Sequence, residues 1–127
     1  MAAFLQLGAI AAGGALGAVS RFGVSTGVYR LLGRDFPWGT LAVNLGGSLL
    51  MGALFVLFIE RSAVASEWRS ALLIGFLGAF TTFSTFSLET LVLLEQGEMA
   101  RALLNIGASV LLCLGACWLG MVAARTM

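Results

Sequence analysis

Four long stretches of this chain contain no Asp, Glu, Lys or Arg. Each is close to or above the roughly 18–20 residues that an α-helix needs to cross the hydrocarbon core of a bilayer. Of the 127 residues, 60% are hydrophobic and 10% are charged, which is too apolar for a soluble domain of this size. The sequence therefore predicts an all-α membrane protein with a single domain, residues 1–127, and four transmembrane helices. The uncharged stretches are Ala2–Ser20, Phe36–Ile59, Ser70–Leu88 and Ala102–Ala124.

The third helix is expected to be broken near its middle, at about residues 75–82, where Gly75 and Gly78 precede a run of Thr and Ser. Glycine and clustered hydroxyl residues hold a straight helix poorly. Backbone without helical hydrogen bonds survives at membrane depth only where protein or water covers it. We therefore expect this segment to be covered. The expected helices span about residues 3–32, 38–60, 67–95 and 98–123.

A tandem triplet follows this weak point, Thr82-Phe83-Ser84 and then Thr85-Phe86-Ser87. Residues three apart share a face of a helix, so the two phenylalanines lie side by side and the hydroxyls gather likewise. Hydroxyl groups donate hydrogen bonds, and the edge of an aromatic ring is the positive end of its quadrupole. Such uncharged donors suit a small anion that must lose water and still leave, because conduction requires moderate binding.

Polar residues also repeat every four positions on the second helix, at Thr40, Asn44 and Ser48, and on the fourth, at Asn105 and Ser109. Each set forms one stripe on an otherwise apolar helix. A buried Asn amide must find hydrogen-bond partners. Two interpretations remain open for Asn44, namely a hydrogen bond between helices or a donor that points into a pore.

Two charged residues fall within the expected spans. A lone guanidinium such as Arg21 costs roughly 2.5–3.5 kcal/mol at the centre of a membrane helix on insertion scales. Arg21 either extends to the interface or lines a wet vestibule, where it would attract anions. Glu89 follows the triplets, and an ionisable residue inside a span is a site residue by default.

The arginines carry no orientation signal. With four spans, the N-terminus, the second loop and the C-terminus share one side of the membrane. Three loop or helix-end arginines fall on each side, whereas orientation is normally set by an excess of Lys and Arg in cytoplasmic loops. We therefore expect insertion in both orientations, which allows pairing with an inverted copy. The two sets are Arg61, Arg69 and Arg125, and Arg30, Arg34 and Arg101.

Other functional classes find little support. The chain has no histidine, and its two cysteines, Cys113 and Cys117, lie four residues apart on the last helix. Two thiols alone do not make a zinc site, and membrane-buried cysteine is most often a small apolar filler. There is no triad and no metal cluster, so no enzyme activity is expected. The net charge of +1 and the absence of a basic patch indicate no nucleic-acid partner.

Three stretches resemble the Fluc (CrcB) family of fluoride channels. They are Gly39-Thr40-Leu41-Ala42-Val43-Asn44, Gly78-Ala79-Phe80-Thr81-Thr82-Phe83-Ser84-Thr85-Phe86-Ser87, and the segment from Gly17 to Arg21. The resemblance covers the whole chain in length, span number and motif order. It implies an antiparallel, dual-topology homodimer with two pores in the bacterial plasma (inner) membrane. It also implies passive export of cytoplasmic fluoride, and hence fluoride resistance.

The resemblance also implies roles for individual residues. Asn44 would contact fluoride, and Phe83 and Phe86 would form a pair of pore phenylalanines. The backbone carbonyls of Gly78 and Thr81 would bind a central structural sodium ion, and no organic cofactor is expected. Asn105 and Cys113 stand where some relatives have an aromatic hydroxyl and a serine. The expected fluoride pathway comprises Asn44, Phe83, Phe86, Thr40, Ser84, Thr85, Ser109, Glu89 and Arg21.

Two other functions remain as alternatives. A small multidrug-type exporter also has four spans, and it needs a membrane carboxylate to exchange protons for cations. The first helix offers only Arg21, so Glu89 would have to serve. A non-transporting scaffold subunit would use the polar stripes only as contacts between helices.

Overall fold

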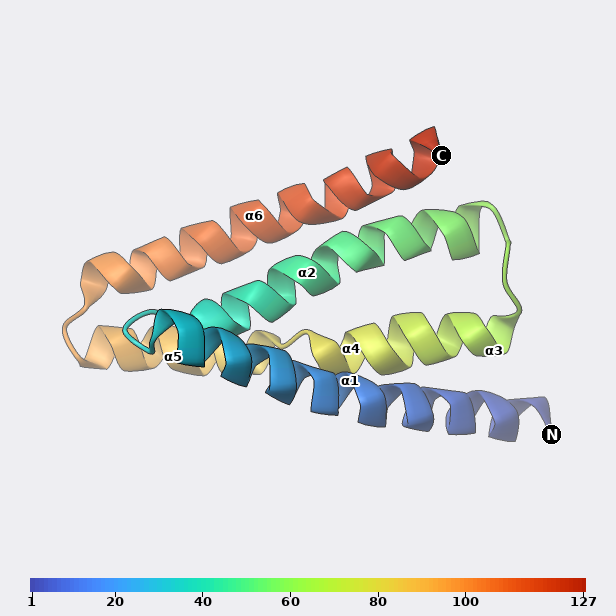
Figure 1. Cartoon of the computed structure of the whole chain (residues 1–127), viewed down its shortest axis with the longest axis horizontal. Helices are drawn as coiled ribbons and strands as arrows, with labels where there is room; N and C mark the ends of the chain where they lie inside the picture. Colours follow the sequence, from blue (N-terminus) through green and yellow to red (C-terminus); the bar gives the residue numbers. More distant parts are fainter.

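The structure is a computed structural model that describes residues 1–127, and it consists of helices joined by short connections (Figure 1). Four helical segments are long and apolar enough to cross a membrane, which confirms the predicted all-α architecture with four candidate spans. The two termini lie at the same end of the bundle, as an even number of spans requires (Figure 1). The four segments are Ala2–Leu32, Trp38–Glu60, Ser66–Glu95 and Met99–Thr126.

The second and third spans change helix type along their length. The second span begins as α2 (Trp38–Phe55) and ends as the π-helical segment η1 (Val56–Glu60). The third span runs through the short α3 (Ser66–Arg69), the π-helical η2 (Ser70–Phe76) and α4 (Leu77–Phe80), and then α5 (Phe83–Glu95). The first and fourth spans are the continuous helices α1 (Ala2–Leu32) and α6 (Met99–Thr126).

Helical conformation is interrupted between α4 and α5. Thr81 has φ −86° and ψ 157°, and Thr82 has φ −151° and ψ 118°, so both residues are extended. The glycines at 75 and 78 remain helical, within η2 and α4. The extended backbone thus lies at the C-terminal edge of the region in which the sequence placed the weak point.

Helix α1 packs against η2 with almost no space between the two backbones. A Cβ atom at Gly13 would collide with the Ala71 carbonyl, and one at Gly17 with the Phe76 carbonyl. On the facing helix, a Cβ at Gly75 would stand 2.6 Å from the Ile10 oxygen. Small residues therefore set the spacing of this pair, as is usual between membrane helices.

Helices α2 and α6 lie side by side along most of their length (Figure 1). A Cβ at Gly52 would collide with the Cys117 carbonyl, and one at Gly120 with the Leu49 carbonyl. By contrast, a Cβ at Gly23 or at Gly27 would meet no atom within 4 Å. Gly13 and Gly17 therefore serve packing within the chain, whereas Gly23 and Gly27, at the same four-residue spacing, do not.

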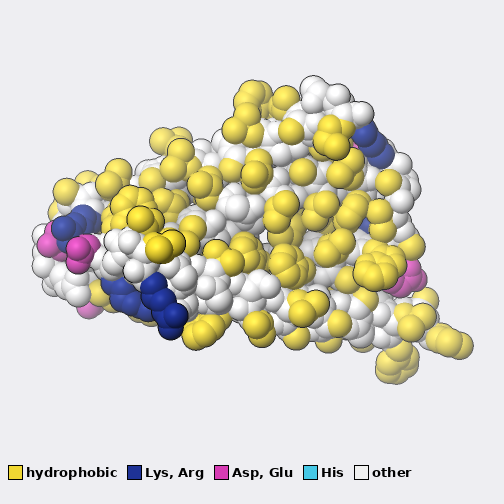
Figure 2. Space-filling model, in the orientation of Figure 1, with side chains coloured by type: hydrophobic (Ala, Val, Ile, Leu, Met, Phe, Trp, Pro, Cys, Tyr) yellow, Lys and Arg dark blue, Asp and Glu magenta, His cyan; other side chains and the backbone are white.

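Few residues are buried within the single chain, 22 of 127. Figure 2 shows apolar side chains spread over the middle of the visible face, with charged side chains gathered towards the two ends. An apolar belt with charged ends is the surface expected of a protein surrounded by lipid.

Candidate functional site

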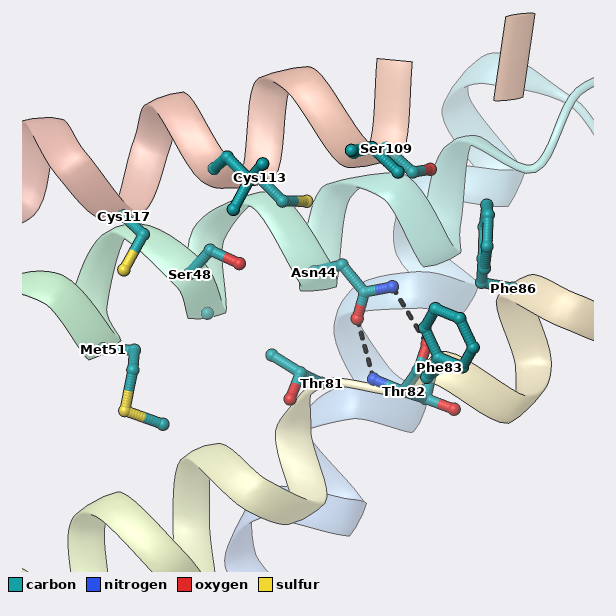
Figure 3. Close-up of a pocket in the computed structure, with 13 residues that line it drawn as sticks. Asn44, Ser48, Met51, Thr81, Thr82, Phe83, Phe86, Ser109, Cys113 and Cys117 are labelled. Carbon is teal, nitrogen blue, oxygen red and sulfur yellow. Dashed lines mark hydrogen bonds between the residues drawn. The ribbon is translucent and has the colours of Figure 1, made fainter. Parts of the chain in front are cut away.

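A cavity of about 480 Å³ opens between α2, the interrupted segment and α6 (Figure 3). It brings together residues from three spans that are far apart in the sequence, among them four of the predicted pathway residues. No acidic or basic side chain lines it. Its lining comprises Asn44, Gly47, Ser48, Met51, Thr81, Thr82, Phe83, Phe86, Ser109, Val110, Cys113, Leu114 and Cys117.

The Asn44 side chain joins α2 to the interrupted backbone. Its Nδ2 donates to the Thr82 carbonyl at 3.0 Å, and its Oδ1 accepts from the Thr82 amide at 2.7 Å (Figure 3). A side-chain amide has two N–H donors, and this pairing uses one. Asn44 therefore supplies a hydrogen bond between helices and still retains one N–H at the cavity wall, so the two interpretations of this residue are compatible.

Two carbonyl groups, one in α4 and one directly after it, lack their helical donors. In an uninterrupted α-helix the Thr82 amide would donate to Gly78 and the Thr85 amide to Thr81. The Thr82 amide instead donates to Asn44, and the Thr85 amide donates to the Thr82 hydroxyl at 3.2 Å. The Gly78 and Thr81 carbonyls therefore both lose their helical donors. A Cβ at Gly78 would meet only the Leu73 oxygen, at 4.0 Å, so that side of α4 is open within the chain.

Phe83 and Phe86 begin α5 and form a pair at the cavity wall. Their ring centroids are 5.4 Å apart and their planes are tilted by 48°. Phe86 is buried, whereas Phe83 is 77% exposed in the single chain. The pairing predicted from the tandem triplet is thus present, but only one of the two rings is held by the rest of the chain.

Hydroxyl groups cluster at the start of α5. The Thr82 hydroxyl donates to Thr85 Oγ1 at 3.0 Å and lies 3.4 Å from Ser84 Oγ. A hydroxyl has one proton, and that of Thr82 is used within the cluster. The Thr85 proton stays free of any partner in the chain, so Thr85 remains a donor.

A second cavity, of about 270 Å³, lies on the other side of Thr82. Arg21, Ser25 and Thr40 line it, together with Thr82 and Thr85. The two ion pairs of the structure involve other arginines, so no carboxylate neutralises the Arg21 guanidinium. Thr82 borders both cavities, the one that contains Arg21 and the one without charged side chains. The complete lining of this cavity comprises Ala18, Arg21, Phe22, Ser25, Thr40, Val43, Thr82 and Thr85.

Thr40 and Glu89 belong to a separate cluster with Tyr29. The hydroxyls of Tyr29 and Thr40 each donate to one oxygen of the Glu89 carboxyl group, the former at 2.7 Å. The Arg34 guanidinium stands 4.5 Å from the centre of the Tyr29 ring. Because the Thr40 proton is directed at Glu89, Thr40 offers the second cavity only its lone pairs.

Tyr29 is a residue of this cluster that the sequence pattern did not indicate. The only signal for it is that it is the chain's single tyrosine, on the same span as Arg21. A Cβ at Gly39 would collide with the Tyr29 ring, so glycine at that position makes room for the ring. This long-range fit is not visible in the spacing of residues.

Ser109 is held by a chain of hydrogen bonds. It donates to Asn105 Oδ1 at 3.3 Å, and Asn105 Nδ2 donates to the Thr90 hydroxyl at 2.9 Å. Thr90 in turn donates to the Phe86 carbonyl at 2.7 Å. Asn105 is only 1% exposed, so it serves this network and does not line either cavity.

The predicted pathway residues thus fall into three groups. Asn44, Phe83, Phe86 and Ser109 line the larger cavity, and Arg21, Thr40 and Thr85 line the smaller one. Glu89 lies behind Thr40, and the exposed Ser84 lies beside Thr82.

Comparison with known proteins gives consistent results. The family model described as "CrcB-like protein, Camphor Resistance (CrcB)" matches residues 8–121. A relative from Methylococcus capsulatus, named fluoride-specific ion channel FluC, is 60% identical over 123 residues, which cover 97% of this chain and 54% of the relative. The chain thus spans about half the length of that relative.

Two further relatives carry the same name and match along nearly their full length. The protein from Magnetococcus marinus is 55% identical over 121 residues, covering 95% of this chain and 98% of its own. That from Hydrogenovibrio crunogenus is 56% identical over 117 residues, covering 92% and 89%.

Proposed function

This chain belongs to the CrcB-like protein family, and from that premise we propose that it is a fluoride-selective passive channel. It is a multi-pass membrane protein, and we assign it to the plasma (inner) membrane of a bacterium. The observation that carries the proposal is the uncharged cavity with one unused Asn44 N–H and two phenylalanine rings on its wall.

Selectivity for fluoride would come from neutral donors. Asn44 Nδ2 and the hydroxyl groups of Ser84 and Thr85 replace water, and the positive edges of Phe83 and Phe86 assist them. No fixed cation lines the larger cavity, so the ion is bound moderately and is able to leave.

One end of the pathway would use the smaller cavity. The Arg21 guanidinium raises the local concentration of anions, and the ion then passes Thr85 and Thr82 into the larger cavity. Two hydroxyl donors, from Tyr29 and Thr40, fix the position of the Glu89 carboxyl group behind Thr40. Ser109 is linked to the Phe86 backbone through Asn105 and Thr90.

The direction of transport follows from acid–base chemistry. Hydrofluoric acid crosses membranes as a neutral molecule and ionises inside the cell. A passive channel lets the trapped anion leave along the membrane potential, so the bacterium becomes resistant to fluoride.

The channel would act as a dimer of two inverted copies. The 77% exposure of Phe83 and the balanced arginine count both support a partner that covers this face. The Gly78 and Thr81 carbonyls, which lack their helical donors, fit a small hard cation that prefers oxygen ligands. They also lie at the C-terminal end of a helical segment, where the partial charge is negative. We therefore assign a structural sodium ion to these carbonyls from both copies.

The experiment is a fluoride-electrode efflux assay on liposomes that contain the purified protein. The expected result is rapid fluoride release with little chloride movement, measured on matched vesicles. Fluoride release no faster than from empty liposomes would overturn the proposed function, and equal chloride and fluoride rates would overturn the proposed basis of selectivity.

A further inference from the structure

Both cysteines of the chain lie on the wall of the larger cavity. Cys113 and Cys117 are four residues apart on the continuous helix α6, so their Cβ atoms lie about 5–6 Å apart on one face. Both are free and half-buried, and both line the cavity that also contains Asn44 (Figure 3). The thiols therefore share one chamber and are not separately packed against lipid.

The donor set selects the kind of ligand. No group of three or more His, Cys, Asp or Glu residues is present, so a closed zinc site cannot be completed. Sulfur is a soft ligand, and it favours soft acceptors over hard cations. A soft acceptor that needs only two thiols therefore matches the pair, whereas a tetrahedral metal does not.

We propose that Cys113 and Cys117 form a dithiol site that binds a trivalent organoarsenical and that the bound ligand blocks the cavity. In the reaction, R–As=O condenses with two S–H groups to give two As–S bonds, and the oxygen leaves as water with both thiol protons. No electrons are transferred, so no oxidant or reductant is needed.

The cavity accommodates such a ligand. Its volume of about 480 Å³ lies in the range typical of sites for small organic molecules, and Val110 and Leu114 add apolar lining for a phenyl group. Asn44 and Phe83 border the same space, so a phenylarsenic group on the two sulfurs stands where the ion is proposed to pass. The expected block of fluoride passage rests on the proposed function, whereas binding of the arsenical to the two thiols does not.

The test uses phenylarsine oxide and the reconstituted protein. Because the chain has only two cysteines, Cys113→Ser and Cys117→Ser each leave one thiol, and the double variant has none. Intact mass under denaturing conditions counts the arsenicals on each chain, and the fluoride electrode measures efflux relative to the same untreated sample.

The wild-type chain is expected to gain one phenylarsenic group and to lose fluoride efflux. A dithiol such as dimercaptopropanol should reverse both effects, and a monothiol at equal thiol concentration should not. Each single variant should need roughly 10²-fold more reagent, because a second tethered ligand raises apparent affinity by about that factor.

Three results would overturn the inference. These are no adduct on the wild-type chain, equal adduct formation in the single variants, and a mass that shows two chains bridged by arsenic. An adduct without loss of fluoride efflux would overturn the proposal that the bound ligand blocks the cavity. If the untreated protein releases no fluoride, the proposed function fails, while the mass measurement still decides whether the dithiol site exists.

Discussion

The Asn44 side chain and the Thr82 backbone, 38 positions apart in the sequence, form a reciprocal pair of hydrogen bonds. This one pair ties α2 to the interrupted third span and satisfies a backbone amide that has left its helix. It also leaves one Asn44 N–H without a partner in the chain and frees the Gly78 carbonyl from its helical donor. The proposed fluoride site and the proposed sodium site thus depend on the same contact.

Replacing Asn44 should separate its two roles. Asn44→Ala leaves the Thr82 amide and carbonyl unpaired, and we expect a loss of about 1–3 kcal/mol in stability together with loss of fluoride efflux. Asn44→Asp keeps an acceptor for the Thr82 amide but adds negative charge to an uncharged cavity. It should preserve thermal stability in detergent better than Ala and still abolish efflux. Rapid fluoride release by the Asp variant would contradict the proposed role.

The two phenylalanines should respond differently to truncation. Phe86 is buried, so Phe86→Ala should cost about 3–5 kcal/mol of stability as well as fluoride flux. Phe83 is 77% exposed in the single chain, so Phe83→Ala should reduce flux without unfolding the chain. Thermal melting and fluoride efflux, measured on the same preparations of the two variants, test this difference. Unchanged flux in the Phe83 variant would remove that ring from the pathway.

Glycine substitutions distinguish packing inside the chain from packing between chains. Gly17→Val should disrupt folding, because its Cβ would strike the Phe76 backbone, whereas Gly23→Val should be tolerated as the matched control. Gly78→Val has room within the chain, so it should fold but fail to assemble a sodium-bound dimer. Size-exclusion chromatography of the three variants shows which of them are folded and which form the dimer. A fully active dimer with valine at 78 would count against the sodium site.

Sodium removal should weaken the dimer and leave the single chain folded. The proposed ligands are neutral carbonyls that have lost their helical donors, so without a cation they face one another unpaired. Exchange of sodium for N-methylglucamine should lower the dimer fraction on chromatography in detergent, and restored sodium should recover it. A dimer whose stability does not change with sodium would rule out this role for the ion.

Glu89 distinguishes a channel from a proton-coupled exporter. A passive channel needs no proton exchange, so we expect fluoride efflux to proceed without a pH gradient in the wild-type protein and in Glu89→Gln. Tyr29→Phe, which removes one of the two hydroxyl donors to the Glu89 carboxyl group, should lower stability by about 1 kcal/mol. Efflux of an organic cation that is driven by protons and abolished by Glu89→Gln would instead favour the small multidrug-type exporter.

Features that depend on neighbours in the sequence were predictable. The uncharged stretches predicted four spans because a bilayer sets the length of apolar helix that it accepts. The tandem triplet predicted the Phe83–Phe86 pair, since residues three apart meet on a helix. The four-residue spacing of Gly13 and Gly17 is typical of close packing between membrane helices, and their contact with η2 agrees. The same reasoning applied equally to Gly23 and Gly27, where no neighbour is present within the chain.

By itself, the sequence determined that this chain lies in a lipid bilayer, how many spans it has and where its polar stripes fall. These features could be predicted because hydropathy and helical periodicity are local properties. Only the tertiary structure decided where each hydroxyl and amide proton goes. Asn44 meets Thr82, Tyr29 meets Glu89, and Ser109 turns towards Asn105. A hydrogen-bond donor has one proton per bond, and which partner receives it depends on distances between helices that no spacing along the chain encodes.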